Sequence, residues 1–339
     1  MVNKTRGQLN VPVIIHNPII QGQYADPDLK YYEGKYWLYP TTDGFEEWSG
    51  KSFKVFSSND LVKWTDEGVI LEEGSLNPGK NIKGIQIAGS TWAQGYAWAP
   101  CSEERNGKYY FYYCGKDEDG VSAIGVASAD NPYGPYIDKE GPLITLAMCK
   151  AAGISLAQVI DPAIFVDDDG QPYMLFGNGC AAIVMLAENM MNIKLETLKP
   201  IGGLVDFRES VTLFKKDGRY HWLWSCDDTG SPDYHVRYGI SETNLRELML
   251  APDNEQIEVT YIKVLLKRDD SNGILGTAHQ STPLLVIDRE GNEHCILAYH
   301  RFFTPLNTYI TGLGYHREVC IGEIEFDTNG FMEEIQPTR

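Results

Sequence analysis

The sequence predicts an all-β protein, a five-bladed β-propeller that forms a single domain over residues 1–339. Three observations carry this prediction: a hairpin pattern recurs five times, turn residues occur throughout, and helical periodicity is almost absent. A β-sandwich with the same number of strands is the structural alternative, but it does not predict a five-fold order.

Each hairpin consists of two β-rich runs joined by a turn that contains glycine. The clearest example runs from Val159 to Gly177, where Asp167–Gly170 joins two apolar runs and Asp161 begins the first. Glycine supplies the positive φ that such a tight connection requires. The five turn glycines are Gly34, Gly107, Gly170, Gly218 and Gly291.

A third strand-forming run follows each hairpin, and segments such as Trp64–Gly68 suit an outer fourth strand. The spacing between the turn glycines is irregular, so loops of different lengths must join the strands. We expect the longest insertions at 72–95, 146–157 and 225–234, and uneven loops on a rigid repeat are where specificity usually lies.

The chain is acidic, and its cysteines are scattered. Its 29 basic and 47 acidic side chains give a net charge of −18, which disfavours nucleic acid and anionic membranes as partners. The seven cysteines form no C-x-x-C pair, which favours free thiols in a reducing compartment. No signal-peptide core is present, and no run approaches the roughly 18 apolar residues of a membrane span. We therefore predict a cytoplasmic protein with a neutral ligand and leave its oligomeric state open.

Three of the five units place a carboxylic acid at nearly the same distance before the turn glycine. Asp26 lies eight residues before its glycine, and Asp161 and Glu209 each lie nine residues before theirs. The first strand of a blade is innermost, so equal offsets aim these acids at one mouth of the central channel. Like charges crowded together cost stability, so such a cluster needs a ligand, a cation or a mechanistic use.

The other two units differ at this place. The ninth residue before the glycine is Trp98 in the second unit and Thr282 in the fifth, where His279 lies three residues earlier. An aromatic side chain suits the apolar face of a sugar. For His279, a structural role and a functional role are equally consistent with the sequence.

Each of these motifs has an ordinary structural explanation when taken alone. Asp-Pro pairs commonly serve as turns, and a lone Glu before an apolar strand is usually solvated. The agreement in offset favours a shared site instead. Glycoside hydrolysis requires at least two carboxylic acids on opposite sides of a pocket. A third carboxylate nearby can keep the general acid of this pair protonated.

With these motifs in this order, the sequence resembles glycoside hydrolase family 43, five-bladed propellers that remove arabinofuranosyl and xylosyl units from plant polysaccharides. The resemblance runs from about Asn17 to Phe331. The motifs that carry it are Ala25-Asp26-Pro27-Asp28, Trp98-Ala99-Pro100, Ile160-Asp161-Pro162 with Asp167-Asp168-Asp169-Gly170, Glu209, and His279 with Ser281.

The resemblance implies a catalytic role for each acid. Asp26 would be the general base that activates water, and Glu209 the general acid. Asp161 would tune the protonation of Glu209 and help to orient it. In many members the sequence after the acid is Gly-Pro, whereas Ser210-Val211 follows Glu209 here, which leaves the local geometry of Glu209 less certain.

The resemblance also implies supporting residues. Arg301 matches an arginine near the sugar-binding site, and Trp98, with Trp92 as a weaker candidate, would form a pocket wall. His279 matches a histidine beside a metal ion or water cluster in the channel. Calcium is the candidate metal there, in a supporting role, and no organic cofactor is expected.

We therefore expect an exo-acting, inverting glycosidase that releases terminal α-L-arabinofuranosyl and β-D-xylosyl residues from arabinoxylan or arabinan oligosaccharides. We expect no C-terminal β-sandwich of the kind that closes the pocket in longer xylosidases. The alternatives are an endo-α-1,5-L-arabinanase and a non-catalytic carbohydrate-binding propeller. Fructan-processing propellers typically carry Arg-Asp-Pro at the middle acid, whereas Ile160 precedes Asp161 here.

Overall fold

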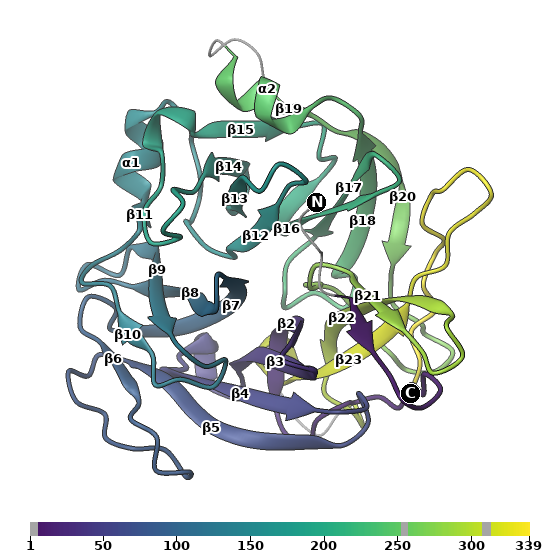
Figure 1. The fold of residues 1–339 in the computed structure, drawn as a ribbon, viewed down its shortest axis with the longest axis horizontal. Helices are drawn as coiled ribbons and strands as arrows, with labels where there is room; N and C mark the ends of the chain where they lie inside the picture. The colour runs from purple at the N-terminus through teal and green to yellow at the C-terminus, as the bar shows by residue number, and fades with distance from the viewer. Residues whose placement is uncertain (1–5, 252–256, 307–312) are drawn as a thin grey trace.

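Five β-sheets surround a central axis in the computed structural model of this chain (Figure 1). The structure describes residues 6–251, 257–306 and 313–339. Each sheet has four or five strands, and the predicted five-bladed propeller is confirmed. None of the helices in these three ranges is long and apolar enough to cross a bilayer.

Three blades are formed by consecutive or nearly consecutive strands. Blade I contains β2 (Tyr24–Tyr32), β3 (Lys35–Thr42), β4 (Ser52–Ser58), β5 (Trp64–Glu73) and β6 (Ala88–Ser90). Blade II contains β7 (Gly95–Arg105), β8 (Lys108–Lys116), β9 (Ser122–Ala129), β10 (Ile137–Asp138) and β11 (Ile144–Thr145). Blade IV contains β16 (Phe207–Lys216), β17 (Arg219–Cys226), β18 (His235–Ser241) and β20 (Thr260–Leu266).

The other two blades borrow a strand from elsewhere in the chain. Blade III contains β12 (Ala163–Val166), β13 (Pro172–Phe176), β14 (Ala181–Met185), β15 (Lys199–Gly202) and the later β19 (Ile257–Glu258). Blade V contains the N-terminal β1 (Gly7–Gln8) with β21 (Leu284–Ile287), β22 (Glu293–Phe302) and β23 (Arg317–Glu323). Because β1 pairs with β21, the beginning of the chain is attached to its last blade.

The short helices lie outside the blades. They are η1 (Glu46–Trp48), α1 (Leu146–Ala151), η2 (Leu195–Thr197), α2 (Leu245–Leu250) and η3 (Leu313–Tyr315). The predicted hairpin at 159–177 is present as β12 and β13, which pair antiparallel. All five turn glycines have positive φ, between 76° and 88°, as a tight connection requires.

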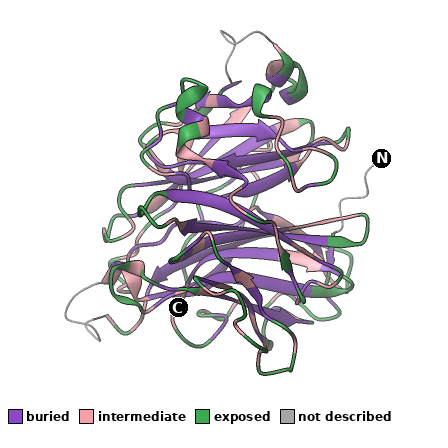
Figure 2. Cartoon of the chain, turned by 90° about the vertical axis from the view of Figure 1, so that its left-hand side faces the viewer, coloured by how far each residue is buried: buried purple, intermediate pink, exposed green. Residues whose placement is uncertain are grey.

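Five clusters of buried apolar side chains each join two neighbouring blades. Between blades I and II, for example, the ring centres of Phe53 and Phe111 are 5.2 Å apart. Burying a side chain of this size stabilises a fold by about 1.5–3 kcal/mol. Figure 2 shows the result: the strands are largely buried, and exposed residues gather in turns and helices.

The innermost strands define a channel with two ends. We call the end at which β2, β7, β12 and β16 begin the near mouth, and the end at which they finish the far mouth. A narrow cavity of about 20 Å³ lies inside the near mouth and is bordered by Asp26, Asp161 and His279. A larger cavity of about 420 Å³ opens at the far mouth. The acids singled out in the sequence therefore lie at one end of the channel only.

Candidate active site

One residue from each blade has a left-handed backbone at the near mouth. Such residues are uncommon outside glycine, cost about 1 kcal/mol or more each, and collect at functional sites. The five residues are Asp26 (φ 47°), Ala99 (φ 36°), Asp161 (φ 60°), Ser210 (φ 57°) and His279 (φ 51°). Three of them fall where β2, β7 and β16 shift register against their partner strands, as at a β-bulge.

The backbone N–H of each left-handed residue donates a hydrogen bond to a side chain of the preceding blade, or of the segment that leads into the first strand of that blade. Five such bonds close a ring around the channel, because blade V precedes blade I. They run from Asp26 to His300 Nδ1 (3.2 Å), from Ala99 to Thr41 Oγ1 (2.7 Å), from Asp161 to Cys114 Sγ (3.1 Å), from Ser210 to Asp161 Oδ2 (3.1 Å) and from His279 to Ser225 Oγ (3.0 Å). Each blade therefore holds the strained residue of the next.

This ring corrects the register expected from the sequence. Glu209 and Trp98 each precede the left-handed residue of their blade, so they are not equivalent to Asp26. In blade V the equivalent residue is His279, and the expectation that Thr282 fills this place was wrong. Counting back from the turn fails because bulges add residues to individual strands. The left-handed φ of Ser210 explains why glycine suits the position after the acid.

Asp26 lies against three basic side chains. Its Oδ1 accepts a hydrogen bond from Arg317 Nη1 at 2.9 Å and lies 3.2 Å from His279 Nδ1. Burial alone would raise the pKa of Asp26, but Arg317 and then His279 hold it well below its ordinary value. Burial lowers the pKa of His300 to about 3, so this imidazole is neutral and can accept from the Asp26 N–H. Asp26 is therefore ionised near neutral pH.

Arg317 is held in place from a second side. Its Nε donates to Asp43 Oδ2 at 2.9 Å, and its Nη1 donates to Thr229 Oγ1 at 3.0 Å. Burial alone would lower the pKa of Arg317, yet Asp26 and Asp43 keep it raised and the guanidinium charged. Sequence reasoning missed Arg317. The only available signal was a charged residue at the start of an apolar strand.

Glu209 is fixed by two neutral donors. Asn178 Nδ2 donates to Glu209 Oε2 at 2.7 Å, and the Tyr234 hydroxyl donates to Oε1 at 2.8 Å. Both donors come from loops that follow the second strands of blades III and IV, and no sequence motif singled them out. The carboxylate is buried, with 7% of the residue exposed. The Nε of Arg208 also lies 3.9 Å from Oε2, so a guanidinium stands near the carboxylate without donating a hydrogen bond to it.

Asp161 and Glu209 form a close pair of acids. One ligand atom each from Asp161, Glu209 and His279 lie within 4.8 Å of one another. Burial, then Glu209 and then Asp26, raise the pKa of the Asp161 carboxyl well above its ordinary value. Two carboxyl groups this close cannot both ionise at low cost, so the pair retains a proton that a general acid can use.

The structure does not bring two of the expected residues to the acids. Arg301 is buried on the other face of β22, where its Nε donates to Glu318 Oε1 at 2.8 Å and its Nη1 to the Thr338 carbonyl at 2.6 Å. Successive strand residues face opposite sides, so Arg301 points away while His300 reaches Asp26. Trp92 packs between blades I and II and donates to the Tyr113 hydroxyl at 3.0 Å.

Trp98 does lie at the near mouth, directly before Ala99. Its Nε1 donates to the Trp48 carbonyl at 2.7 Å, and its ring packs edge-on against Tyr96 at 5.3 Å. Trp48 in turn donates to the Gly314 carbonyl at 2.8 Å. These partly buried aromatic residues form part of the rim, and only Trp98 was expected from the sequence.

A metal ion fits this site in part. Asp161, Glu209 and His279 form the one group of suitable ligand atoms in the described part of the chain. Calcium takes six to eight oxygen ligands. The group offers two carboxylates and an imidazole nitrogen, so most of a calcium shell would be water. The same two carboxylates are also the acid pair.

Three buried carboxyl groups around one mouth of a propeller channel are suited to glycoside hydrolysis, which uses a pair of carboxylic acids. The sequence pattern of the family described as glycosyl hydrolases family 43 matches residues 15–332. The chain therefore belongs to glycosyl hydrolases family 43, and it is a glycoside hydrolase.

Two curated relatives show the range of activities in similar chains. A β-xylosidase of Xylanibacter ruminicola is 32% identical over 343 residues, which cover 92% of this chain and 96% of the relative. A β-D-galactofuranosidase, xynD, of Aspergillus niger is 28% identical over 330 residues, which cover 93% of this chain and 83% of the relative.

Solved structures confirm the fold. A thermostable family-43 glycoside hydrolase has a TM-score of 0.73 and 23% identity, with 96% of each chain covered. A β-xylosidase/α-arabinofuranosidase from a compost microbial metagenome has a TM-score of 0.66 and 24% identity, with 97% of this chain and 98% of that chain covered. The latter was solved with xylotriose in a calcium-free form.

Proposed function

We propose that this glycoside hydrolase acts at chain ends and releases terminal α-L-arabinofuranosyl and β-D-xylosyl residues, with inversion, from plant cell-wall oligosaccharides. The observation that carries the proposal is the contrast in surroundings of neighbouring acids: Arg317 contacts Asp26, whereas Asp161 and Glu209 lie beside each other. Asp26 is held ionised by Arg317, whereas the pair of Asp161 and Glu209 retains a proton. Pairs of carboxyl groups whose environments separate their pKa values are typical of general acid–base catalysis.

In the proposed mechanism, Asp26 takes a proton from a water molecule whose oxygen forms a bond to the anomeric carbon. The glycosidic bond breaks at the same time, and Glu209 gives its proton to the leaving oxygen. Asp161 keeps that proton available, and Tyr234 and Asn178 orient Glu209. A single displacement of this kind inverts the configuration and needs carboxyl groups roughly 6.5–9.5 Å apart.

Hydrolysis of nitrophenyl glycosides tests the proposal. We expect the wild type to release pentose from the α-L-arabinofuranoside and the β-D-xyloside, and NMR of the first product should show the inverted anomer. The β-D-galactofuranoside is a necessary comparison because a relative carries that activity in its name. Inactivity on both pentosides, or a product with retained configuration, would refute the proposal.

An endo-arabinanase is the alternative among enzymes, and its products distinguish it. Linear arabinan should yield single pentose units from the enzyme that we propose. Early accumulation of longer oligosaccharides would instead indicate internal cleavage.

We further propose that a calcium ion can bind beside His279, with water completing its shell, and that it supports the site without taking part in bond cleavage. Calcium should then raise the melting temperature of the wild type above its value in chelator. The His279→Ala variant should lose this difference. An equal rise in both proteins would place the ion elsewhere.

We also propose that the enzyme acts in the cytoplasm on imported oligosaccharides. All seven cysteines are unpaired, which a reducing compartment allows. Fractionation of the source cells, followed by detection of the protein with antibodies, tests this location. Recovery in the culture medium would contradict it.

A further inference from the structure

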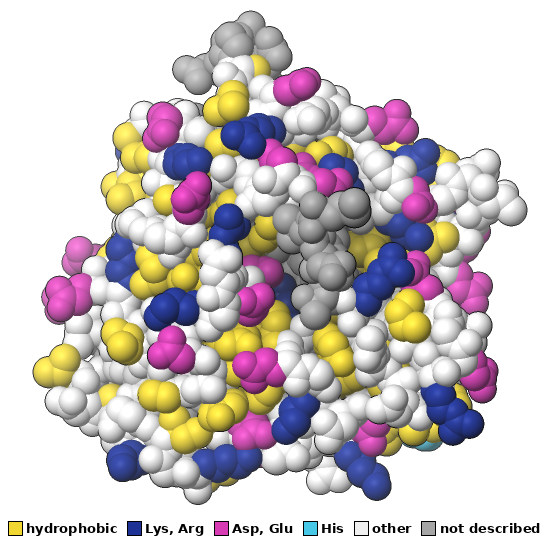
Figure 3. All heavy atoms as spheres, viewed as in Figure 1, with side chains coloured by type: hydrophobic (Ala, Val, Ile, Leu, Met, Phe, Trp, Pro, Cys, Tyr) yellow, Lys and Arg dark blue, Asp and Glu magenta, His cyan; other side chains and the backbone are white. Residues whose placement is uncertain are grey.

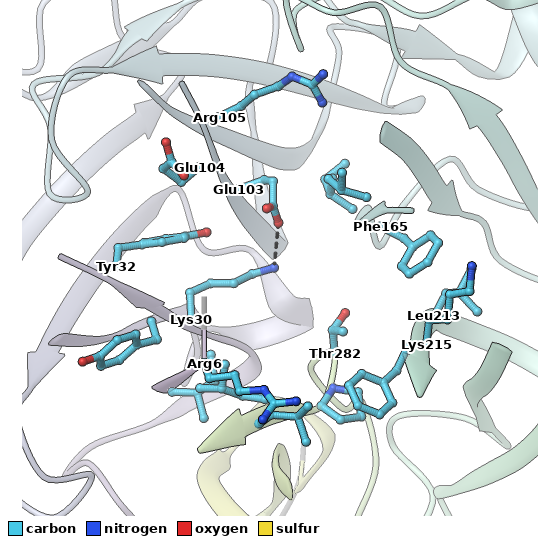
Figure 4. A pocket seen from close by; sticks show the side chains of 18 of the residues that line it. Arg6, Lys30, Tyr32, Glu103, Glu104, Arg105, Phe165, Leu213, Lys215 and Thr282 are labelled. Carbon is cyan, nitrogen blue, oxygen red and sulfur yellow. Dashed lines mark hydrogen bonds and ion pairs between the residues drawn. The ribbon is translucent and has the colours of Figure 1, made fainter. Parts of the chain in front are cut away.

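The far mouth contains the cavity of about 420 Å³, at the opposite end of the channel from the acids (Figure 4). Small-molecule sites typically enclose roughly 300–1,000 Å³. All five blades contribute to the lining. The narrow cavity at the near mouth and the far cavity share Thr282, so they follow one another along the channel.

A charged group forms the polar side of this cavity. Lys30 Nζ lies 3.3 Å from Glu103 Oε2 and 3.6 Å from Asp28 Oδ1. In Figure 4 the Lys30 and Glu103 side chains point toward each other from β2 and β7. Their side chains are only 12% and 22% exposed. The Lys30 ammonium and the Glu103 carboxyl group line the cavity and provide both donors and acceptors to a ligand with several hydroxyl groups, whereas Asp28 lines the near-mouth cavity.

An apolar side lies across the cavity from this group. Phe165 and Leu213, from blades III and IV, stand on that side in Figure 4. Leu284 and Leu285 of blade V continue it. A cavity with one polar and one apolar side matches a sugar ring, which has hydroxyl groups at its edge and C–H groups on its faces.

The cations around the cavity are already engaged by protein groups. Lys215 Nζ lies 2.7 Å from Asp167 and 2.9 Å from Asp168, and Arg6 Nη1 lies 2.9 Å from Glu293. Arg105 Nη1 donates to the Gly170 carbonyl at 2.9 Å. On the face shown in Figure 3, basic and acidic side chains are interspersed. With a net charge of −18 on the chain, these contacts disfavour an anionic ligand.

We propose that the far-mouth cavity is a second ligand site that binds a neutral monosaccharide or disaccharide, separate from the catalytic site. The choice of pentoses as probes rests on the proposed function, whereas the site itself rests on the cavity. Lys30 and Glu103 bind the hydroxyl groups, and the partly exposed Leu284 and Leu285 contact the ring face.

Equilibrium dialysis with radiolabelled D-xylose and L-arabinose counts the sites. We expect two bound sugars per wild-type chain at saturation. The Val166→Trp variant fills the cavity from the end of β12 and should bind one. Val121→Trp, at an exposed valine outside both cavities, should still bind two. Hydrolysis of nitrophenyl pentosides should stay within twofold of the wild type in both variants.

Several outcomes would overturn the proposal. An equal number of sites in the wild type and in Val166→Trp would show that the cavity binds no sugar. Tighter retention of labelled glucuronate or phosphate than of xylose would show that the ligand class is wrong. If Val166→Trp does not fold, Leu285→Trp fills the same cavity from blade V and gives the same count. Failure of the proposed function is distinguishable, because the wild type would then not hydrolyse the pentosides, while Val166→Trp would still bind one sugar fewer than the wild type.

Discussion

The two mouths of the channel are formed by the same innermost strands, yet they differ in charge and in where left-handed residues occur. At the far ends of β2, β7 and β16 such residues are confined to the hairpin turns. At the near mouth each blade contributes a left-handed residue, and neighbouring acids are driven toward opposite protonation states. At the far mouth Lys30 and Lys215 each contact two carboxyl groups, so opposite charges balance locally. Unequal pKa values serve proton transfer, whereas balanced charges serve the recognition of a neutral ligand.

Substitution of one acid at each end should give the largest difference. Asp26→Asn removes the proposed base, and general-base catalysis contributes about 10²–10⁴-fold. We expect kcat for nitrophenyl arabinofuranoside to fall by about 10³-fold. Glu103→Gln changes an acid that lines only the far cavity, where the amide oxygen can still accept from Lys30. Its kcat should fall less than about tenfold. Equal losses in the two variants would remove the distinction between the mouths.

Replacement of the two buried arginines of blade V tests what holds Asp26 ionised. Lysine keeps the charge but not the planar fork, so Arg317→Lys cannot contact Asp26 and Asp43 together. We expect kcat/KM to fall roughly 10-fold to 100-fold. The pKa of Asp26 should rise because Arg317 lowers it in the wild type. Since the base must be ionised, the acidic limb of the pH profile should move to higher pH.

Arg301→Lys is the matched control for this experiment. Arg301 is as deeply buried as Arg317 but pairs with Glu318 on the other face of the strand. The Arg301→Lys variant should lower the stability of the fold without moving the acidic limb of the pH profile. A shift of that limb in Arg301→Lys, or none in Arg317→Lys, would contradict the assignment of Arg317.

The contrast between these arginines also shows how far the sequence alone was informative. Asp26, Asp161 and Glu209 each lie beside a local hairpin signal, so their meeting at one mouth was predictable. The partners Arg317, Tyr234 and Asn178 were not. Their contacts depend on which face of a strand points inward and on how one blade docks against the next, and a bulge changes both. Arg301 was expected from the resemblance alone, whereas the structure places the neighbouring His300 against Asp26.

The smallest effect concerns the backbone at the two ends of β16. Ser210 has φ 57° at the near mouth, and Asp217 has φ 52° in the turn at the other end of the strand. Aspartate tolerates this region because its side chain can hydrogen-bond locally, whereas serine does so less readily. Ser210→Gly should therefore relieve strain that Asp217→Gly does not.

We expect Ser210→Gly to stabilise the fold by roughly 0.5 kcal/mol, since relieved strain of about 1 kcal/mol is partly offset by the greater freedom of glycine in the unfolded chain. Asp217→Gly should leave stability unchanged or lower it. Urea unfolding at equilibrium measures both. The bond from the Ser210 N–H to Asp161 survives in Ser210→Gly, so a large loss of activity would mean that the strain itself positions Glu209. Equal stabilisation by both glycines would show instead that the near mouth holds no more strain than an ordinary hairpin turn.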